Sequence, residues 1–342
     1  MLIDSPFAGA THDVSAWAAG GEAAGYDGLV IAELAHDPFI AATVAGLATD
    51  RVRVATGVAI AFARNPMTVA ASSWDLQRLT GGRFALGLGS QIAPHITRRF
   101  SMPWSAPASR MREFILAVRA IWECWQERTP LRFRGEHYTH TLMTPMFDPG
   151  PLGVPGPPIL LAAVGPHMLR VAAQVADGLV VHPFTTPAYL REVTLPALAS
   201  ELGDRSMANF EVDGQVLAVS GRTDAEFESS RRAVSAQIAF YGSTPAYRPV
   251  LAHHGLGDVG DELHRLSVRG GWAAMADLID DDILDLFAVQ GSPAQVAAGL
   301  TERYADLLDR ATPTLLGAGE DVGAQVVGRL RAAMNGGPGG AS

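Results

Sequence analysis

Short apolar runs recur along the whole chain, and each is followed by a longer stretch that mixes apolar and polar residues. Runs that are nearly continuous in Val, Ile, Leu and Ala are typical of parallel strands buried on both faces. The pattern predicts strands at residues 2–3, 28–32, 52–58, 83–89, 158–164, 178–182, 212–220 and 312–317. We expect helices between them, because four prolines stand where a first helical turn would begin: Pro66, Pro166, Pro187 and Pro293.

Alternating strands and helices predict a parallel sheet, and eight such units predict an α/β fold of the closed (β/α)8 type, the TIM barrel. An open doubly wound sheet with a second domain is the alternative. Two stretches interrupt the alternation, 135–157 after the fourth strand and 241–287 after the seventh. Long irregular insertions in a compact domain are usually functional. We therefore expect one barrel domain over residues 1–334 and a flexible Gly-rich tail over 335–342.

Composition narrows the possible functions. The formal net charge of -9 argues against a nucleic-acid partner, which would usually require a basic patch. All 26 basic residues are arginine, so Schiff-base lysine chemistry and a P-loop are excluded. The single cysteine, Cys124, lies between two tryptophans in a helical stretch and is expected to be a packed thiol. No apolar run is long enough for a membrane span and no signal peptide is evident, so we expect a cytoplasmic protein without a membrane partner.

The segment "RFALGLGSQIAPHI", residues 83–96, tests the alternative fold. A dinucleotide-binding loop needs G-x-G-x-x-G directly after the first strand. Here Ile92 stands at the third glycine position, the loop follows the fourth strand, and Pro94 interrupts the helix that should begin there. We therefore interpret the segment as the C-terminal end of a barrel strand, where active sites of this fold are built.

Other predicted strands also end in polar residues and glycines. Because the C-terminal ends of barrel strands meet on one rim, these residues form a candidate active site, although each histidine alone could be structural. They are Glu33, His36, Thr56, Gly57, Ser90, Gln91, His95, Gly165, His167 and His182. Gly165 and Pro166 stand between a strand and a helix start, where free backbone N–H groups can hold a phosphate. A tight connection that needs glycine for its turn is the other interpretation.

Metal and hydrolase motifs are weak. His137 with His140, and His253 with His254, are pairs in loops without a further ligand nearby in the sequence. The acids at 280–282 lack the glycine and glutamate of a calcium loop, and we interpret them as a solvated helix face. In "GLGSQ" a glutamine replaces the second glycine of a nucleophile elbow. We expect no metal site.

Four segments carry a family resemblance: "GYDGLVIAE", "RVRVATGV", "GGRFALGLGS" and "LLAAVGP…VADGLVVHPF". In this order they resemble the luciferase-like flavin and deazaflavin barrel superfamily, and within it the oxidoreductases that depend on coenzyme F420, an 8-hydroxy-5-deazaflavin. The resemblance extends from about residue 2 to residue 317. It implies a TIM barrel, a small-molecule substrate and a homodimer.

The resemblance also implies roles for particular residues. Ser90 and Gln91 would line the cofactor ring, and a non-prolyl cis peptide would join Gly57 to Val58 behind it. The backbone of the segment Ala163, Val164, Gly165, Pro166 and His167 would hold the cofactor phosphate. Relatives carry an asparagine near the position of His95. They often carry an adjacent acid–histidine pair where Glu33 and His36 are separated, and a catalytic glutamate near the position of Ile92. The first strand, at 2–3, is unusually short.

We therefore expect an F420-dependent hydride-transfer oxidoreductase in which the protein orients the deazaflavin against a small organic substrate. The proton partner would be His36 or Glu33, with His95 and the substrate-facing His182 as substitutes. Arg64, Arg98 and Arg99 are candidates for binding the acidic tail of the cofactor. One alternative is an FMN-dependent monooxygenase of the same fold, and another is a barrel that binds a cofactor or partner without turnover.

Overall fold

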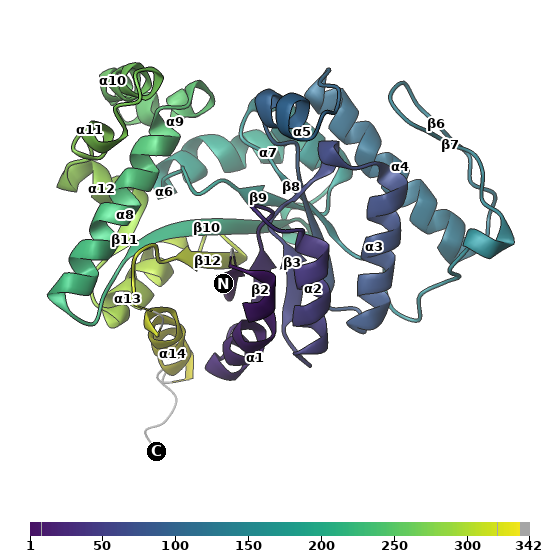
Figure 1. The fold of residues 1–342 in the computed structure, drawn as a ribbon, viewed down its shortest axis with the longest axis horizontal. Helices are drawn as coiled ribbons and strands as arrows, with labels where there is room; N and C mark the ends of the chain where they lie inside the picture. The colour runs from purple at the N-terminus through teal and green to yellow at the C-terminus, as the bar shows by residue number, and fades with distance from the viewer. Residues whose placement is uncertain (8, 320, 336–342) are drawn as a thin grey trace.

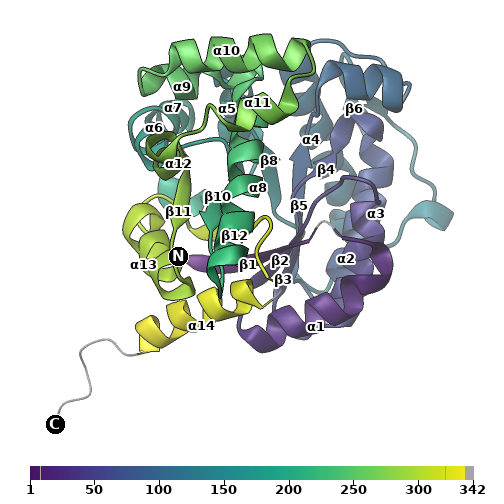
Figure 2. The same cartoon turned by 60° about the vertical axis from the view of Figure 1, so that its left-hand side comes forward.

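Eight parallel strands close into a barrel in the computed structural model, which describes residues 1–7, 9–319 and 321–335 (Figures 1 and 2). Each strand pairs with the next, and the last pairs back with the first through Leu2 opposite Arg310. The TIM-barrel prediction is confirmed. The strands are β1 (Leu2–Phe7), β2 (Gly28–Ile31), β3 (Arg53–Thr56), β5 (Phe84–Gly89), β8 (Ile159–Ala162), β9 (Gly178–Val181), β10 (Glu211–Val219) and β12 (Arg310–Thr314).

Helices follow the strands and cover the outside of the barrel (Figure 1). They are α1 (Val14–Ala24), α2 (Pro38–Leu47), α3 (Pro66–Leu79), α4 (Pro107–Glu127), α5 (Pro166–Val175), α6 (Pro187–Tyr189), α7 (Leu195–Glu201), α8 (Asp224–Gly242), α13 (Pro293–Tyr304) and α14 (Val322–Asn335). The four prolines expected at helix starts begin α3, α5, α6 and α13. Apart from Asn335, which ends α14, the expected tail lies outside the described residues.

The prediction of a first strand confined to residues 2–3 is wrong, because β1 continues to Phe7. Asp4 and Ser5 interrupt the apolar run, but both are buried with polar partners. Asp4 accepts hydrogen bonds from Arg310, and Ser5 accepts one from the Trp17 indole. Two further short strands, β4 (Ala59–Ile60) beside β5 and β11 (Ala288–Gln290) beside the end of β10, were not predicted.

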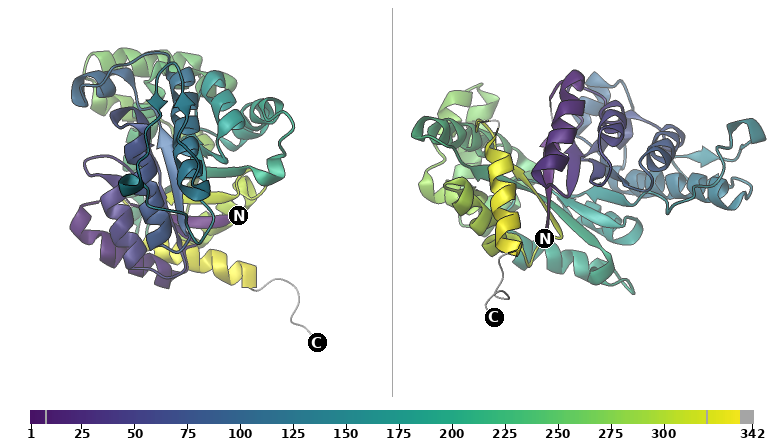
Figure 3. Two further views of the ribbon diagram at one scale, coloured as in Figure 1. Left: turned by 90° about the vertical axis from the view of Figure 1, so that its right-hand side faces the viewer. Right: turned by 90° about the horizontal axis from the view of Figure 1, so that it is seen from below.

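The two predicted insertions are present. At the start of the first is an antiparallel hairpin, whose strand β6 (Phe133–Arg134) lies just before the predicted bound of 135 and whose strand β7 (Thr139–His140) lies within the insertion. The hairpin projects from the body beside α4 (Figures 1 and 3). The second forms a group of helices beside α8 (Figure 2), and a separate apolar cluster packs them there. These helices are α9 (Arg248–His253), α10 (Gly257–Val268), α11 (Trp272–Ala276) and α12 (Asp281–Phe287).

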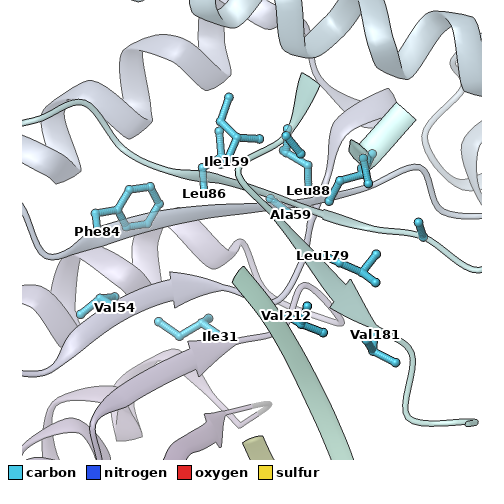
Figure 4. Packing of buried hydrophobic residues seen from close by; sticks show 14 of the residues in the cluster. Ile31, Val54, Ala59, Phe84, Leu86, Leu88, Ile159, Leu179, Val181 and Val212 are labelled. Atoms are coloured by element: carbon cyan, nitrogen blue, oxygen red, sulfur yellow. The ribbon is translucent and has the colours of Figure 1, made fainter. Parts of the chain in front are cut away.

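Strand residues alternate between two apolar layers. Figure 4 shows the outward layer, which includes Ile31, Val54 and Leu86 and belongs to one cluster with helix residues such as Trp74 and Phe114. The neighbouring residues point into the barrel, where they form a small cluster of their own: Val30, Ala55, Ala85, Leu160 and Val180. The interior residues are small or medium-sized, so the barrel keeps a pocket at its centre.

Charged side chains close the N-terminal end of the barrel. Arg53 binds the carboxylates of Glu211 and Asp213, and its Nη2 lies 3.4 Å from Asp4 Oδ2. Arg310 Nε and Nη2 donate to Asp4 over 2.8 and 2.5 Å. This cluster occupies the strand starts, opposite the C-terminal end where the predicted site residues lie.

Candidate active site at the open end of the barrel

Gly57, directly after β3, and Gly87 of β5 lie where neighbouring strands approach closely. A Cβ atom on Gly57 would lie 2.1 Å from Val30 Cγ1, and one on Gly87 would lie 1.9 Å from the carbonyl oxygen of Thr56. Thr56 Oγ1 joins the two strands, because it donates to Gly87 O over 2.8 Å and accepts from Gly87 N over 2.9 Å. The Val30 side chain and the Thr56 carbonyl therefore occupy the space that a side chain would need, so only glycine fits at these two positions.

The peptide bond between Gly57 and Val58 is cis, as the family resemblance implied. Gly57 N donates to Ile31 O over 2.7 Å, which ties this bond to the end of β2. Thr56 and Gly57 also line the pocket at the barrel centre, together with residues from five other strands. Those residues are Val30, Leu160, Val180, Asp213, Gly214, Gln215 and Thr312. The cis bond thus lies at the boundary between the pocket and the open end.

Glu33 is largely buried, and its carboxylate is paired with an arginine. Its side chain is 6% exposed, and its two oxygens lie 2.9 and 2.7 Å from Arg64 Nη1. One of these oxygens also accepts from Ile60 N over 2.7 Å. Arg64 Nη2 in turn binds Asp37, which caps the start of α2. Glu33 and Arg64 are therefore paired with each other, and the pair joins the loops that follow β2 and β3.

His36 and His95 lie on neighbouring loops. Both residues are exposed, His36 after β2 and His95 at the start of the π-helical turn η3 (His95–Arg99). Arg99 Nη2 donates to Leu34 O over 2.7 Å and thereby connects the two loops. Within the described residues, neither imidazole has a hydrogen-bond partner. Both histidines are consequently accessible to a ligand at the open end.

Ser90 and Gln91 shape the loop after β5. Gln91 has a left-handed backbone with φ 58°, and its side-chain oxygen accepts from Ile92 N over 3.0 Å. Ser90 Oγ donates to Gln91 O over 3.1 Å. These local bonds hold a sharp turn directly after Gly89, the last residue of β5.

The start of α5 presents exposed backbone. Ala163 is buried, whereas Val164, Gly165, Pro166 and His167 are exposed. A Cβ atom on Gly165 would meet nothing within 4 Å, and Gly165 O accepts from the amides of Met168 and Leu169. In the described chain no acceptor binds the N–H of His167, as expected for the first turn of a helix. The positive end of the α5 dipole adds to this N–H, so the segment is suited to an anion.

His182 is the buried histidine of the rim. Burial lowers its pKa from 6.5 to about 4. Its Nδ1 accepts the N–H of Phe184 over 3.1 Å, and its Nε2 lies 2.9 Å from the hydroxyl oxygen of Tyr247. The ring stacks on Tyr247 with centroids 4.4 Å apart and meets the edge of Tyr241 at 4.6 Å.

Tyr241 and Tyr247 were not among the candidates from sequence. They flank the start of the second insertion, 241–287, and no periodic pattern marks them as site residues. A sequence argument could have used only their aromatic type within an insertion next to the rim. The pKa of Tyr247 is raised by burial, and by the neighbouring Tyr241, to about 12.

Three of the other histidines considered from sequence have protein partners, whereas His140 Nε2 is buried without a hydrogen-bond partner among the described atoms. His137 Nε2 lies 3.1 Å from Ser109 Oγ, His253 lies 3.3 Å from Glu192, and His254 Nε2 lies 2.8 Å from Thr186 Oγ1. The described part of the chain contains no group of three or more His, Cys, Asp or Glu side chains arranged to hold a metal ion.

Two other residues considered from sequence have structural roles. Asp280 caps α12, and Cys124 is buried in α4 as expected. Among the helices described, none is long and apolar enough to cross a membrane.

Comparison with known proteins places this geometry in context. Residues 5–311 match the family model described as luciferase-like monooxygenase. The chain is 50% identical over 299 residues to an uncharacterised protein of Mycobacterium tuberculosis, covering 87% of this chain and 88% of that protein. It is 26% identical over 289 residues to 5,10-methylenetetrahydromethanopterin reductase of Archaeoglobus fulgidus, covering 82% of this chain and 80% of that protein.

The fold is similar to that of the coenzyme F420 dependent tetrahydromethanopterin reductase from Methanopyrus kandleri. The TM-score is 0.76 at 18% identity, and the match covers 95% of this chain and 96% of that chain. At this identity the likeness concerns the fold. The match runs along nearly the whole chain, so both insertions fall within the fold of the relatives.

Proposed function

This chain belongs to the luciferase-like monooxygenase family and is an oxidoreductase, and we propose that it uses coenzyme F420 to transfer a hydride to or from a small organic substrate. The observation that carries the proposal is that Gly57, which lines the central pocket, and the exposed start of α5 both lie at the open end of the barrel. A planar ring needs room at the mouth of the pocket, where Gly57 adds no side chain, and a phosphate needs unpaired N–H groups. We assign the ring to the pocket mouth beside Gly57 and the phosphate to the segment Gly165 to His167.

The residues present fit a deazaflavin bound through its ring and phosphate. The ring would be held by Gly57, Val58, Ser90 and Gln91, because these residues follow the neighbouring strands β3 and β5 at the open end. The backbone of residues 163–167 would hold the phosphate. When bound, the cofactor supplies a two-electron hydride centre, and the protein positions the substrate and excludes water.

The remaining candidates divide by their environment. Glu33 is paired with Arg64, so we assign it to loop structure. His36 is exposed on the same loop after β2 and is our proposed proton partner, with His95 as its substitute. His182, which Tyr247 and Phe184 hold in place, would face the substrate.

Two surface arginines bear on the choice of cofactor. Coenzyme F420 carries an acidic oligoglutamate tail, and an acidic protein needs local positive charge to bind it. Arg98 is exposed in η3, whereas Arg99 binds Leu34 O and Arg64 binds Glu33. We therefore propose Arg98 as the principal contact of the tail, with Arg99 contributing from the same turn.

The test compares coenzyme F420 with FMN by absorbance and fluorescence titration of the same protein. The proposal requires tighter binding of F420, a preference that weakens with salt and in the Arg98→Ala plus Arg99→Ala variant, because screening reduces exposed ionic contacts. It also requires substrate-dependent oxidation of reduced F420 without oxygen uptake. Tight FMN binding with oxygen uptake would replace the proposal by an FMN-dependent monooxygenase, which the family description favours as second candidate.

We further propose that the protein acts as a cytoplasmic homodimer. Apolar side chains are exposed on two adjacent helices, Ile40 and Leu47 on α2 and Leu79 on α3. A second copy could cover this surface. Sedimentation of the wild type and of Ile40→Glu would show whether the surface forms an interface.

A further inference from the structure

The hydrogen bonds of His182 determine where the proton of Tyr247 can point. Phe184 N–H donates to Nδ1, so Nδ1 carries no hydrogen. A neutral imidazole has one N–H, which must then be on Nε2. Nε2 lies 2.9 Å from Tyr247 Oη, so the tyrosine oxygen accepts this N–H. The hydroxyl hydrogen of Tyr247 is therefore available to a different acceptor.

This hydroxyl lies at the open end of the barrel. Side chains of a strand alternate between faces, so Gly178, Val180 and His182 share the inward face of β9 and its extension. Val180 lines the central pocket, and His182 lies one step closer to the open end. Tyr247 rests on His182 from the second insertion and is half-buried. The His182–Tyr247 pair therefore stands above the pocket.

Packing fixes the orientation of the tyrosine. Its ring stacks on His182 at 4.4 Å and lies 5.7 Å from Phe184, which itself stacks on Phe287 at 4.6 Å. Tyr241 meets the His182 ring from the other direction at 4.6 Å. Burial keeps the imidazole neutral, since its pKa is lowered to about 4. The pair therefore presents one oriented hydrogen-bond donor. The imidazole N–H of His182 fixes the position of the Tyr247 oxygen, and the Tyr247 hydroxyl can donate its hydrogen to a ligand.

We propose that Tyr247 binds the substrate through a hydrogen bond from its hydroxyl to a carbonyl oxygen, and that this contact selects carbonyl compounds for the site. The inference rests on the proposed function, because a carbonyl carbon is a natural hydride acceptor. The donor would polarise the carbonyl bond and hold its carbon at the mouth of the pocket. His182 is a positioning residue in this arrangement, and the hydroxyl is the group that touches the substrate.

The experiment uses two probes of the same shape, cyclohexanone and methylenecyclohexane, which differ in one oxygen. Calorimetric titration measures both dissociation constants in the wild type, with and without oxidised F420. The wild type should prefer the ketone, and Tyr247→Phe should reduce that preference about two- to tenfold, the usual worth of one neutral hydrogen bond. Tyr241→Phe is the matched control, because its ring lies in the same cluster but its hydroxyl does not contact His182 in the described structure.

Nitrogen chemical shifts of His182 provide a readout without any ligand. The wild type should show the Nε2–H tautomer, and Tyr247→Phe should retain a folded protein with an altered Nε2 shift. An Nδ1–H tautomer, an unchanged ketone preference in Tyr247→Phe, or an equal loss in Tyr241→Phe would each overturn the assignment. Failure of F420 to bind the wild type would instead refute the proposed function. Even then, a ketone preference in the cofactor-free protein that is lost in Tyr247→Phe would support the inference about Tyr247.

Discussion

Glu33 holds the guanidinium of Arg64 with both carboxylate oxygens, at 2.9 and 2.7 Å from Nη1. The contact joins two segments that lie 31 residues apart in the sequence. Despite the opposing effect of burial, the hydrogen bonds that Arg64 donates to Glu33 and Asp37 hold its pKa above the ordinary value. The pair thus keeps the loop after β2 against the segment that follows the cis peptide, and it acts on the site through loop position.

Replacing Glu33 with glutamine should therefore destabilise the protein. The change removes a largely buried charge partner and should lower the free energy of unfolding by about 2–3 kcal/mol, because Asp37 is then the carboxylate that still binds Arg64. Urea unfolding measures the loss. Asp306→Asn, which breaks the exposed pair with Arg191, is the control and should have a much smaller effect. Full stability with lost turnover would instead support proton transfer by Glu33.

His36 should behave in the opposite way. It is exposed and unpaired within the described residues, so His36→Gln should leave stability and cofactor affinity unchanged. Turnover, followed as oxidation of reduced F420, should fall by about 10²–10⁴, the usual contribution of general acid–base catalysis. His95→Gln is the matched change on the neighbouring loop. If turnover falls in His95→Gln and not in His36→Gln, then His95 is the proton partner instead of His36.

The start of α5 allows a paired test of the anion site. Gly165 has φ −101° and open space around its Cβ position, so both Gly165→Ala and Gly165→Glu should fold. The alanine variant should retain cofactor binding. The glutamate variant should lose it by more than tenfold, because a negative side chain opposes an anion at a helix start. Equal affinities in the two variants would remove the phosphate from residues 163–167.

The apolar runs predicted the barrel because buried parallel strands leave a local signal that needs no knowledge of partners. The second half of β1 was missed because its polar residues are explained only by partners that are distant in the sequence. Asp4 and Ser5 look like loop residues until Arg310 and Trp17, distant in sequence, supply their partners. Sequence alone does not reveal such pairs.

In the candidate site, too, some residues could be predicted from local sequence and others depend on distant partners. Gly57 and Gly165 could be singled out because strand ends and helix starts are visible in the sequence, and family resemblance suggested their roles. Tyr247 could not, because its relation to His182 depends on how the second insertion folds back over a strand 65 residues earlier. Glu33 looked like a catalytic acid because its pairing with Arg64 is visible only in three dimensions.

Burial of His182 should make the protein sensitive to acid. Its pKa is about 4 in the native state and about 6.5 in the unfolded chain, so the unfolded state binds more protons between these values. Stability should therefore fall as the pH decreases through this range, by about 2 kcal/mol at pH 5 from this group alone. His182→Gln can keep both hydrogen bonds but cannot titrate, and its loss between pH 7 and pH 5 should be smaller by that amount. Equal losses in urea unfolding would show that His182 is accessible to protons in the native state.

The charged cluster at the closed end of the barrel gives the last prediction. Three carboxylates, Asp4, Glu211 and Asp213, share two guanidinium groups, Arg53 and Arg310. Burial, together with Glu211 and Asp4, raises the pKa of Asp213, although Arg53 opposes the shift. Asp213 Oδ1 is buried without a partner among the described atoms. We therefore expect Asp213 to keep its proton to a higher pH in the folded chain than in the unfolded chain.

Asp213→Asn mimics that protonated acid, so its stability at pH 7 should equal or exceed that of the wild type. A native state that retains a proton loses stability as the pH rises above the ordinary carboxyl pKa, and the asparagine variant should lack this decline. Asp4→Asn is the contrasting change, because Asp4 accepts two bonds from Arg310, and it should cost about 3–5 kcal/mol. Urea unfolding of the wild type and both variants at pH 4 and pH 7 measures the difference. A loss in Asp213→Asn as large as that in Asp4→Asn would mean that Asp213 is ionised in the folded barrel.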